Sequence, residues 1–398
     1  MKVNIKKEKA SSIFYDGKFY DTDKELELSF SEAIRLGRIA KVETNFDSVP
    51  YGSSLWKNDK FINFSGDIDL QSGFGNVSYY LIKESLPELS IAHVGKAFGV
   101  RDQGIHSVQN KQLNQAGAMI WHDQPRENWL YSPFQKNIAI IPWETTVVPK
   151  SWIGKINGFD GLLVPCKQNI EAFKSSGVKI PIGLIKWGVD TEKFHYLERQ
   201  NSPAFTFGTM GALSLRKGTD VLIQAFREEF PTEKDVKLIC KTSYNNYPFL
   251  VKDPRIEVQV TAVGVEELME NFYKRIDVGV FPYRGEGFGM CPLECLATGA
   301  PVIITGWSGG MEYYDPNCCL KLDYTMTDAK SFSDVVYKEP CGQWAEPSVE
   351  HLRKLMRWCY ENREKVKEMG KYAGKHVQEK WLWKDTIKDF HKELDKLL

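Results

Sequence analysis

The sequence predicts an α/β protein with two doubly wound parallel sheets, and three observations favour this class. The chain has 398 residues, which is more than one ordinary hydrophobic core organises and indicates two domains. Short apolar runs of strand length alternate with helical patterns, most regularly after residue 203. Glycine-rich loops join several of these strands to the next helix, and open parallel sheets bind ligands at such loops.

The composition excludes several classes of protein. Lys plus Arg and Asp plus Glu both total 52, so no basic field suited to nucleic acid is expected. The sequence contains no run of 18 apolar residues, and its first residues lack the apolar segment of a signal peptide. The 8 cysteines include no Cys-x-x-Cys pair, which argues against zinc and disulfide frameworks. A cytoplasmic protein without a metal site is therefore expected.

Residues 1–60 are interpreted as an N-terminal elaboration of a first domain that spans residues 1–190. Asp16-Gly17 lies between two aromatic runs and predicts a hairpin. A helical pattern follows from Ser31 to Ile39. No function is predicted for this segment.

The first domain contains one glycine loop and two candidate histidines. An apolar strand over residues 61–65 leads to Gly73 and Gly75, which open a helix and can bring the backbone close to a ligand. A plain tight turn explains these glycines equally well. His122 ends a short strand and is the preferred ligand-facing histidine, whereas His93 has a similar local setting and is the competitor. A structural role is the alternative for both histidines.

The second domain is predicted over residues 203–375, followed by a last helix over 376–398. Asn201-Ser-Pro203 favours a linker just before it, and the last helix is amphipathic. The acids on that helix offset its lysines, which weakens but leaves open a peripheral membrane contact. Strands are predicted over residues 205–210, 236–240, 278–281 and 301–305, and helices over 218–230 and 265–274. Gly211, Lys217, Glu286 and Gly309 then follow strand ends, where ligands bind.

The densest group of candidate site residues begins at Glu286, in the run E-G-F-G-M-C-P-L-E. It predicts a strand, a glycine loop and a helix with Pro292 as first residue and Gly299 at its end. The free N–H groups at such a helix start bind anions. Glu286 and Glu294 flank this anion site, which is explained if the bound anion carries hydroxyl groups for the two acids to hold. Arg216 and Lys217 can pair with a diphosphate from the neighbouring loop.

At these residues the sequence resembles the retaining glycosyltransferases of family 4, whose pattern is E-G-F-G-x-x-x-x-E. The continuation ECLATGAPVIITGWSGGMEYY fits the same family's helix, Gly-x-Pro strand and Gly-Gly loop. The resemblance is clearest over residues 204–315 and looser from about 63 to 195. It implies the GT-B architecture, with two Rossmann-like domains facing a cleft and a last helix that crosses back to the first domain.

The resemblance also implies an activity: transfer of a hexose from a nucleotide-sugar donor, such as a UDP- or GDP-sugar, to a hydroxyl of a glycan or other acceptor. Glu286 would hold hydroxyls of the transferred sugar, Glu294 those of the ribose, and His122 would lie near the donor sugar. Lys217, Arg216 and the amides of residues 287–289 would carry the diphosphate charge, so that neither a metal ion nor a cofactor is needed. The further donor-binding residues are Gly287, Phe288, Gly289, Gly73, Gly75 and Thr261.

Two segments complete the resemblance. Trp143-Glu144 is similar to a segment that precedes the last strand of the first domain in the family. Glu144 can face the acceptor cleft, but a surface or helix-capping role is preferred. The arginine that family members carry five positions before the lysine is absent, because Ala212 stands there, and Arg216 is the candidate replacement.

Other functions stay open at this point. A nucleotide-sugar epimerase or a phosphorylase would share the architecture, and a phosphorylase would need a pyridoxal-phosphate lysine. A non-catalytic nucleotide-sugar-binding subunit is favoured by Ala212. A Rossmann dehydrogenase ranks last, because no Gly-x-Gly-x-x-Gly follows a strand with an acid about 20 residues further on.

Overall fold

The computed structural model describes residues 61–398 apart from 71, 99, 101, 110–116, 126–134, 200–201 and 244–251. Within residues 1–60 it describes five strands: β1 (Lys2–Ile5), β2 (Ser12–Tyr15), β3 (Lys18–Asp21), β4 (Glu25–Glu27) and β5 (Val42–Thr44). β2 and β3 pair antiparallel with Tyr15 opposite Lys18, which confirms the predicted hairpin, although its turn residues lie outside the described part. The predicted helix from Ser31 to Ile39 also lies outside it.

The first domain is built on a six-stranded sheet in the order β13-β12-β11-β10-β6-β8, with every neighbouring pair parallel. Its inner strands are short, mostly apolar and largely buried, as expected for a sheet covered on both faces. The strands are β6 (Phe61–Ser65), β8 (Ser90–Val94), β10 (Ala118–His122), β11 (Lys136–Ile140), β12 (Gly161–Val164) and β13 (Ile182–Leu184). The helices are α3 (Gly73–Ser85), α4 (Gln103–Val108), α5 (Lys150–Ile156) and α6 (Lys167–Ser175). A small parallel pair joins β7 (Ile68–Asp69) and β9 (Ala97–Phe98).

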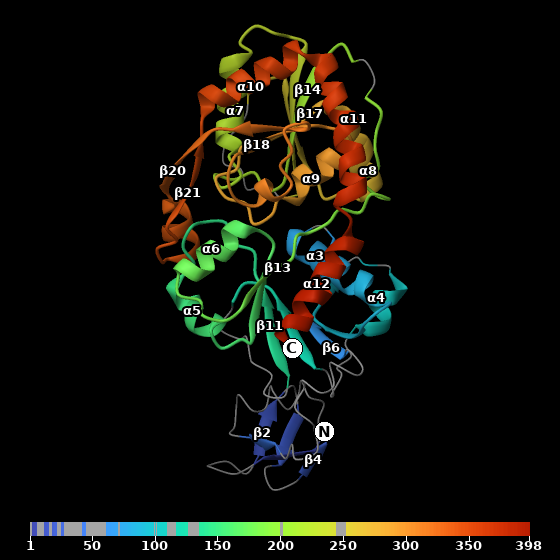
Figure 1. The fold of residues 1–398 in the computed structure, drawn as a ribbon, viewed down its shortest axis with the longest axis vertical. Helices are drawn as coiled ribbons and strands as arrows, with labels where there is room; N and C mark the ends of the chain where they lie inside the picture. The colour runs from blue at the N-terminus through green and yellow to red at the C-terminus, as the bar shows by residue number, and fades with distance from the viewer. Residues whose placement is uncertain are drawn as a thin grey trace.

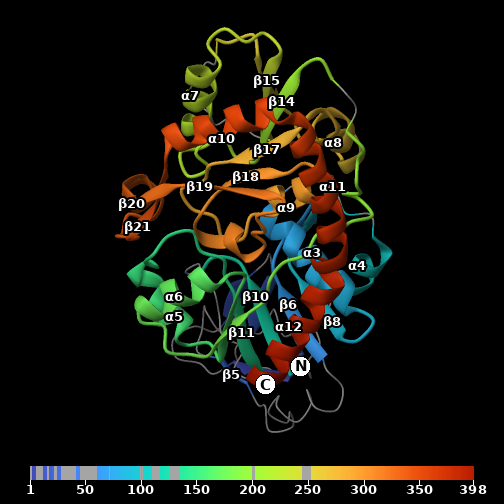
Figure 2. The same cartoon turned by 45° about the horizontal axis from the view of Figure 1, so that its top comes forward.

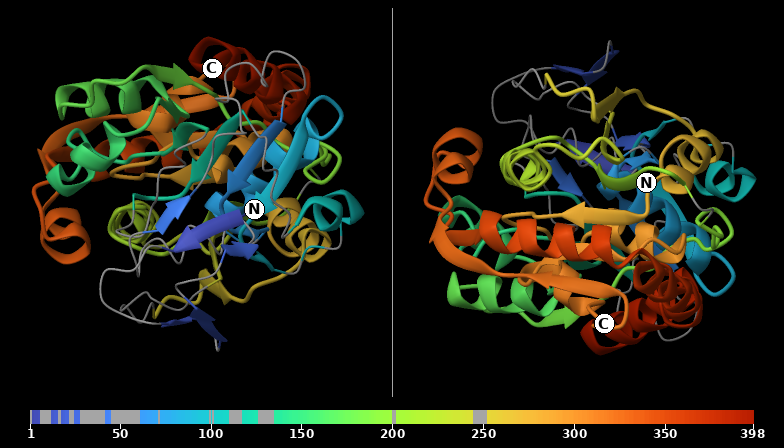
Figure 3. Two further views of the ribbon diagram at one scale, coloured as in Figure 1. Left: turned by 90° about the horizontal axis from the view of Figure 1, so that it is seen from below. Right: turned by 90° about the horizontal axis from the view of Figure 1, so that it is seen from above.

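The second domain repeats this architecture with the parallel strand order β16-β15-β14-β17-β18-β19. The four predicted strands are all present, and β16 and β19 were not predicted. The strands are β14 (Phe205–Met210), β15 (Val236–Thr242), β16 (Ile256–Val260), β17 (Val278–Phe281), β18 (Val302–Thr305) and β19 (Cys319–Leu322). The helices are α7 (Thr219–Glu229), α8 (Val265–Asn271), α9 (Met290–Ala297), α10 (Val349–Glu361) and α11 (Arg363–Lys380). Figure 1 shows the two domains one above the other, each with its own sheet, and the view from above in Figure 3 looks down on α10.

The chain returns to the first domain at its end, as the GT-B expectation requires. α11 ends at Lys380, and the crossing helix α12 spans Trp383–Leu397. The last helix therefore begins at Trp383 and not at the predicted residue 376. The break is fixed by the linker, because the Val189 N–H donates to the Trp381 carbonyl at 2.8 Å. α12 then packs on α3 and β13, and Figure 2 shows this helix in red beside them. No helix in the described part of the chain is long and apolar enough to cross a membrane.

A hairpin of the second domain reaches across to the first on the other side of the cleft, and was not predicted. We call it the arm: β20 (Tyr324–Asp328), the helical turn η3 (Phe332–Tyr337) and β21 (Gln343–Pro347). The Thr146 N–H of the first domain donates to the Gln343 carbonyl at 2.9 Å, and the Val147 N–H donates to the Cys341 carbonyl at 3.2 Å. In Figure 1 the arm runs down from the second domain toward α5 and α6.

Aromatic side chains make the contact between the arm and the first domain largely apolar. Tyr337 of the arm lies 5.1 Å from Trp143 and 5.4 Å from Trp152 between ring centroids, and Phe332 lies 5.6 Å from Trp143. Trp143 is fully buried there, in one hydrophobic cluster with residues of both domains. Such ring pairs add to the ordinary stabilisation from apolar burial. The two domains are thus joined by the linker, by α12 and by the arm.

Candidate active site

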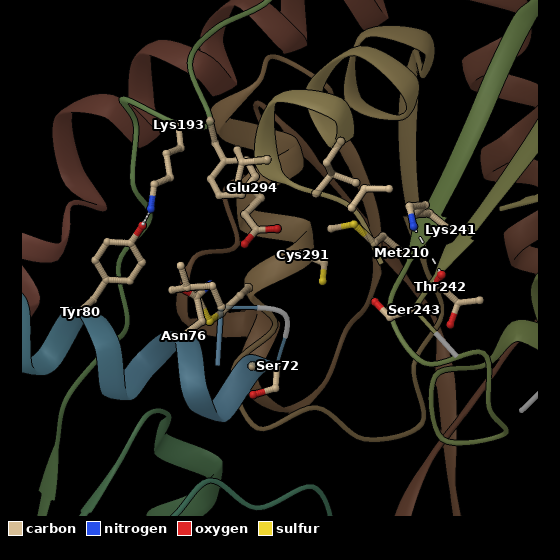
Figure 4. A pocket seen from close by; sticks show the side chains of 18 residues that line it. Ser72, Asn76, Tyr80, Lys193, Met210, Lys241, Thr242, Ser243, Cys291 and Glu294 are labelled. Atoms are coloured by element: carbon tan, nitrogen blue, oxygen red, sulfur yellow. Dashed lines mark hydrogen bonds between the residues drawn. The ribbon is translucent and has the colours of Figure 1, made fainter. Parts of the chain in front are cut away.

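A cavity of about 190 Å³ lies between the domains and is lined by residues of both. The first domain contributes the start of α3, and the linker contributes Lys193 and Phe194. The second domain contributes the carboxyl ends of β14 and β15 together with the first turns of α9, as the strand-end rule predicts. Figure 4 shows Ser72, Asn76 and Tyr80 on the α3 side and Met210, Lys241, Thr242, Ser243, Cys291 and Glu294 on the other.

Glu294 is the acid inside this cavity. It lies in the second turn of α9, its residue is 6% exposed, and the Tyr273 hydroxyl donates to its Oε2 at 2.7 Å. Burial raises the pKa of the Glu294 carboxyl to about 7. Figure 4 shows the carboxylate pointing into the space between Asn76 and Cys291. Near neutral pH this group therefore changes between a neutral and a charged hydrogen-bond acceptor.

Glu286 lies outside the cavity lining and forms the centre of a charged cluster. The Lys217 ammonium contacts its Oε2, and the Arg216 Nη1 lies 4.0 Å from its Oε1. Burial raises the pKa of the Glu286 carboxyl, but the charges of Lys217 and Arg216 outweigh it and hold that pKa below the ordinary value. The structure thus brings three of the predicted site residues together.

Glu144 adds a second carboxylate to this cluster from the first domain. Its Oε1 lies 3.7 Å from the Arg216 Nη1, and its Oε2 is buried with no hydrogen-bond partner among the described residues. Burial raises the pKa of the Glu144 carboxyl above its ordinary value. The preferred surface or capping role was wrong, because β11 ends in a loop that runs into the cleft rather than along the surface.

The Glu286 loop packs directly against that loop of the first domain. A Cβ added at Gly285 would lie 2.0 Å from the Glu144 carbonyl oxygen, and one added at Gly287 would lie 2.7 Å from the Pro142 Cβ. Glycine is therefore needed at both places for the domains to approach. The Phe288 side chain is fully buried against Trp187, so it is not available to a ligand.

We expect Gly285→Ala to loosen this contact, because its methyl group cannot share space with a backbone oxygen 2.0 Å away. Overpacking of this kind typically costs about 1–3 kcal/mol. Denaturant unfolding should show that loss, and small-angle scattering should show a larger radius of gyration. Gly154→Ala is the control, since nothing lies within 4 Å of a Cβ at that position. Equal curves for the two variants would contradict the packing argument.

The helix of the motif begins two residues earlier than predicted. Gly289 has φ +91° and precedes Met290, so Pro292 is the third residue of α9 and not the first. Proline fits there because the first four N–H groups of a helix have no partner within it. Gly299, with φ +83°, follows the helix as predicted. Met290 and Cys291 line the cavity, so that the positive end of the helix faces it.

The two first-domain glycines differ in what they face. Gly73 lines the cavity, and nothing lies within 4 Å of a Cβ added there. Gly75 instead packs on β7, because an added Cβ would lie 2.2 Å from the Asp69 nitrogen. The ligand-facing prediction for Gly75 was wrong, and close packing of α3 on β7 explains this glycine.

The histidines are both buried and neither lines the cavity. His122 shares a 2.8 Å hydrogen bond with the Ser78 hydroxyl through Nδ1, and its Nε2 has no partner among the described residues. Burial lowers the pKa of His122 to about 3, so the ring is neutral. His93 bonds the Gly66 carbonyl at 2.6 Å through Nε2, which is a structural contact between β8 and the loop after β6.

Thr261 is exposed and outside the cavity lining, and its carbonyl accepts from the Lys241 ammonium. The cavity is lined instead by Lys241 and the two residues after it, at the carboxyl end of β15. His122 was selected because ligands bind at the carboxyl ends of strands in open parallel sheets. The same rule applies to Lys241, so Lys241 could have been predicted from the sequence.

A second group that the sequence did not indicate holds the linker to α3. The Tyr80 hydroxyl donates to Asp190 at 2.6 Å and accepts from the Lys193 ammonium at 2.9 Å. Tyr80 also stacks on Trp383 of α12, with ring centroids 4.8 Å apart. Figure 4 shows Tyr80 and Lys193 at one edge of the cavity. These partners are far apart in the chain, and local patterns therefore could not pair them.

Two Rossmann-like domains around a cleft, with a last helix that returns to the first, are the GT-B architecture of glycosyltransferases. Residues 204–334 match the family model described as Glycosyl transferases group 1. This match lies in the second domain and includes the loops that hold Lys217 and Glu286.

Named relatives agree with that class. The chain is 28% identical over 144 residues to the lipopolysaccharide core biosynthesis mannosyltransferase LpsB of Rhizobium meliloti (strain 1021), covering 32% of this chain and 41% of that protein. It is 27% identical over 190 residues to the O-antigen biosynthesis glycosyltransferase WclY of Escherichia coli, covering 45% and 51%. The matches thus span about half the length of these relatives or less.

Among solved structures, the chain is similar to Alr3699/HepE of Anabaena, determined in complex with UDP and glucose. The TM-score is 0.60 at 11% identity, and the match covers 85% of this chain and 100% of that one. At this level of identity the likeness establishes the fold.

Proposed function

We propose that the protein is a retaining glycosyltransferase that transfers a sugar from a nucleotide-sugar to an acceptor hydroxyl without a metal ion. The observation that carries this proposal is the separation of the two motif acids. Glu294 lies within the interdomain cavity, whereas Glu286 lies in a cluster with Lys217 and Arg216. An acid in a cavity suits a ribose, and an acid beside two cations suits a sugar attached to a phosphate.

The donor would occupy the cavity with its ribose at Glu294 and its diphosphate at the start of α9. Met290 and Cys291 line the cavity there, and so does Gly211, where an added Cβ would lie 3.9 Å from the Lys217 Cε. The diphosphate thus reaches Lys217 and Arg216, which supply positive charge where negative charge develops. The sugar then lies beside Glu286.

The chemical step exchanges one C–O bond for another. The bond from the sugar C1 to the phosphate oxygen breaks, a bond from C1 to the acceptor oxygen forms on the same face, and the acceptor proton moves to the departing phosphate oxygen. Lys217 and Arg216 stabilise the leaving diphosphate, and Glu286 orients the sugar through its hydroxyls. His122 is neutral and would act by holding α3 through Ser78, near the cavity-lining Asn76.

The relatives indicate which acceptor class and location to test first. Two relatives are named for lipopolysaccharide core and O-antigen biosynthesis, and one structural neighbour was determined in complex with UDP and glucose. We therefore propose a glycan acceptor, a UDP-hexose as the first donor to test, and a cytoplasmic location. A non-catalytic nucleotide-sugar-binding subunit is the second candidate, favoured by Ala212 at the position of the family arginine.

A donor screen tests the proposal. UDP-, GDP- and ADP-sugars are added in a thermal-shift assay, and nucleotide release is followed with and without glycan acceptors and with EDTA. Binding, release that increases with acceptor, resistance to EDTA and a product with the donor's anomeric configuration are expected. Binding without release would favour the non-catalytic subunit, and a changed sugar without transfer would favour an epimerase. Inversion or loss of activity in EDTA would each overturn that part of the proposal.

We expect Glu286→Gln to lower turnover by about 10–100-fold with little change in nucleotide affinity, since a charged hydrogen bond contributes about 1.5–3 kcal/mol. Glu266→Gln is the control, because Glu266 is an exposed acid of the same domain. Steady-state kinetics and calorimetry with the free nucleotide separate the two quantities. A loss of nucleotide affinity as large as that expected for Glu294 variants would show that the roles of the two acids are misassigned.

A further inference from the structure

We propose that Arg284 is a positioning residue that fixes the basic loop, residues 215–217, beside Glu286 and ties this arrangement to the arm. The inference rests on the proposed function, because the basic loop carries the cations assigned to the donor diphosphate. Arg284 itself contacts neither the cavity nor Glu286 through its side chain, so that any effect on the reaction must pass through its partners.

The Arg284 guanidinium donates hydrogen bonds through all three of its nitrogen atoms. Nη1 donates to Oδ1 and Nη2 donates to Oδ2 of Asp220 in α7, both at 2.9 Å. Nε and Nη2 each donate at 2.6 Å to Glu346 in β21, and Nη1 also donates to the Leu215 carbonyl at 2.5 Å. The residue is 7% exposed. One buried side chain thus connects the basic loop, the helix after it and the arm.

The backbone of Arg284 repeats these links. Its N–H donates to the Arg216 carbonyl at 2.7 Å, and its carbonyl accepts from the Ala345 N–H at 2.9 Å. The Arg216 side chain returns the contact by donating to the Gly285 carbonyl at 2.9 Å. The loop that holds Lys217 and the loop that holds Glu286 are therefore fixed to each other at several points around this residue.

The same residue connects the site to the first domain. Glu346 and Ala345, which bond Arg284, belong to β21, and Gln343 of the same strand accepts from the first-domain Thr146 N–H. Docking of the arm thus reaches the basic loop through a short series of hydrogen bonds. A lysine could keep one charge at this position but could not serve two carboxylates and a carbonyl, because it lacks the planar fork.

The variant Arg284→Lys is expected to fold. The side chains of Asp220 and Glu346 are 30% and 36% exposed, so water can replace some of the hydrogen bonds that the guanidinium donated to them. Arg255→Lys is a matched control in the same domain. Arg255 also binds a carboxylate, that of Asp253, and two backbone carbonyls, but it contacts neither the cavity nor the charged cluster.

The test compares the affinities of UDP, GDP and ADP with those of the matching nucleosides by calorimetry. Arg284→Lys should weaken diphosphate binding by about tenfold or more and leave nucleoside binding unchanged, since small displacements of binding groups have effects of this size. Arg255→Lys should change neither. In a Lys217→Met background the Arg284→Lys effect should largely disappear. Equal losses for nucleoside and diphosphate, or full additivity with Lys217→Met, would overturn the proposal.

Hydrogen exchange separates this proposal from the proposed function. Amides around residues 211–219 and 343–347 should exchange faster in Arg284→Lys than in the wild type or in Arg255→Lys, whatever ligand the protein binds. Unchanged exchange there would overturn the positioning role. Faster exchange in a protein whose wild type binds no nucleoside diphosphate would support the positioning role and refute the proposed function.

Discussion

Replacing Lys217 with methionine should lower the rate of sugar transfer by about 10²–10³-fold, the usual effect of removing a preorganised charge stabiliser. The Lys217 ammonium contacts Glu286 from the loop before α7 and, in the proposed mechanism, faces the leaving diphosphate. Methionine keeps most of the length of the side chain and removes its charge together with the hydrogen-bond donors of the ammonium group. Nucleoside binding should be unchanged, because the nucleoside would lie on the other side of the α9 start, near Glu294.

The same variant should change the pH dependence of turnover. Lys217 is the larger of the two cationic influences that lower the pKa of Glu286, so its loss leaves burial opposed mainly by Arg216, and that pKa should rise. The acidic limb of the pH–rate profile should move to higher pH accordingly. Lys274→Met is the control, since Lys274 pairs with Glu270 on the surface at 2.8 Å. A turnover within twofold of the wild type would refute the role of Lys217.

The second large effect concerns Glu294 and stability. Its folded-state pKa, about 7, is higher than the ordinary value of 4.5, so the unfolded chain loses this proton at lower pH than the native protein does. The stability that protonated Glu294 contributes to the folded state is fully present below the ordinary pKa and is lost as pH rises toward 7. The wild type should therefore lose about 3 kcal/mol of stability from this group between about pH 4 and about pH 8.

Glu294→Gln should remove this loss, because the amide does not ionise and still accepts from the Tyr273 hydroxyl. Denaturant unfolding across that pH range measures the effect, with Glu266→Gln as an exposed control. Nucleotide affinity should fall by about 10–100-fold in Glu294→Gln at about pH 8, and it should no longer increase as pH rises through 7. Parallel stability curves for variant and wild type would contradict the raised pKa.

Local patterns predicted the second domain well, because each of its βα units is short and has its own signals. The strand over residues 278–281 and the end of the next helix at Gly299 both follow from neighbouring residues. The helix start was misplaced because Gly289 with its positive φ begins the helix, whereas proline tolerates any place in the first turn. Residues 1–60 showed the opposite limit, since their strands β1, β4 and β5 were not predicted from any local signal.

The parts of the site that could not be predicted depend on contacts between distant segments. Glu144 and Arg216 meet only because Gly285 lets two loops of different domains approach closely. Arg284 stands two residues before the motif glutamate, yet its importance depends on partners 62 and 64 positions away, Glu346 and Asp220. The arm was not predicted either. Its aromatic residues are typical of an ordinary hydrophobic core, and their contacts with Trp143 and Trp152 become evident only in the folded structure.

The arm also limits how the two domains can move relative to each other. Linker and α12 close one side of the molecule, and the hydrogen bonds of Thr146 and Val147 to the arm close the other. Because the two domains are connected on both sides, they cannot open by rotation about a single hinge while the arm stays bound. Separation of the two domains therefore requires the hydrogen bonds of Thr146 and Val147 to the arm to break.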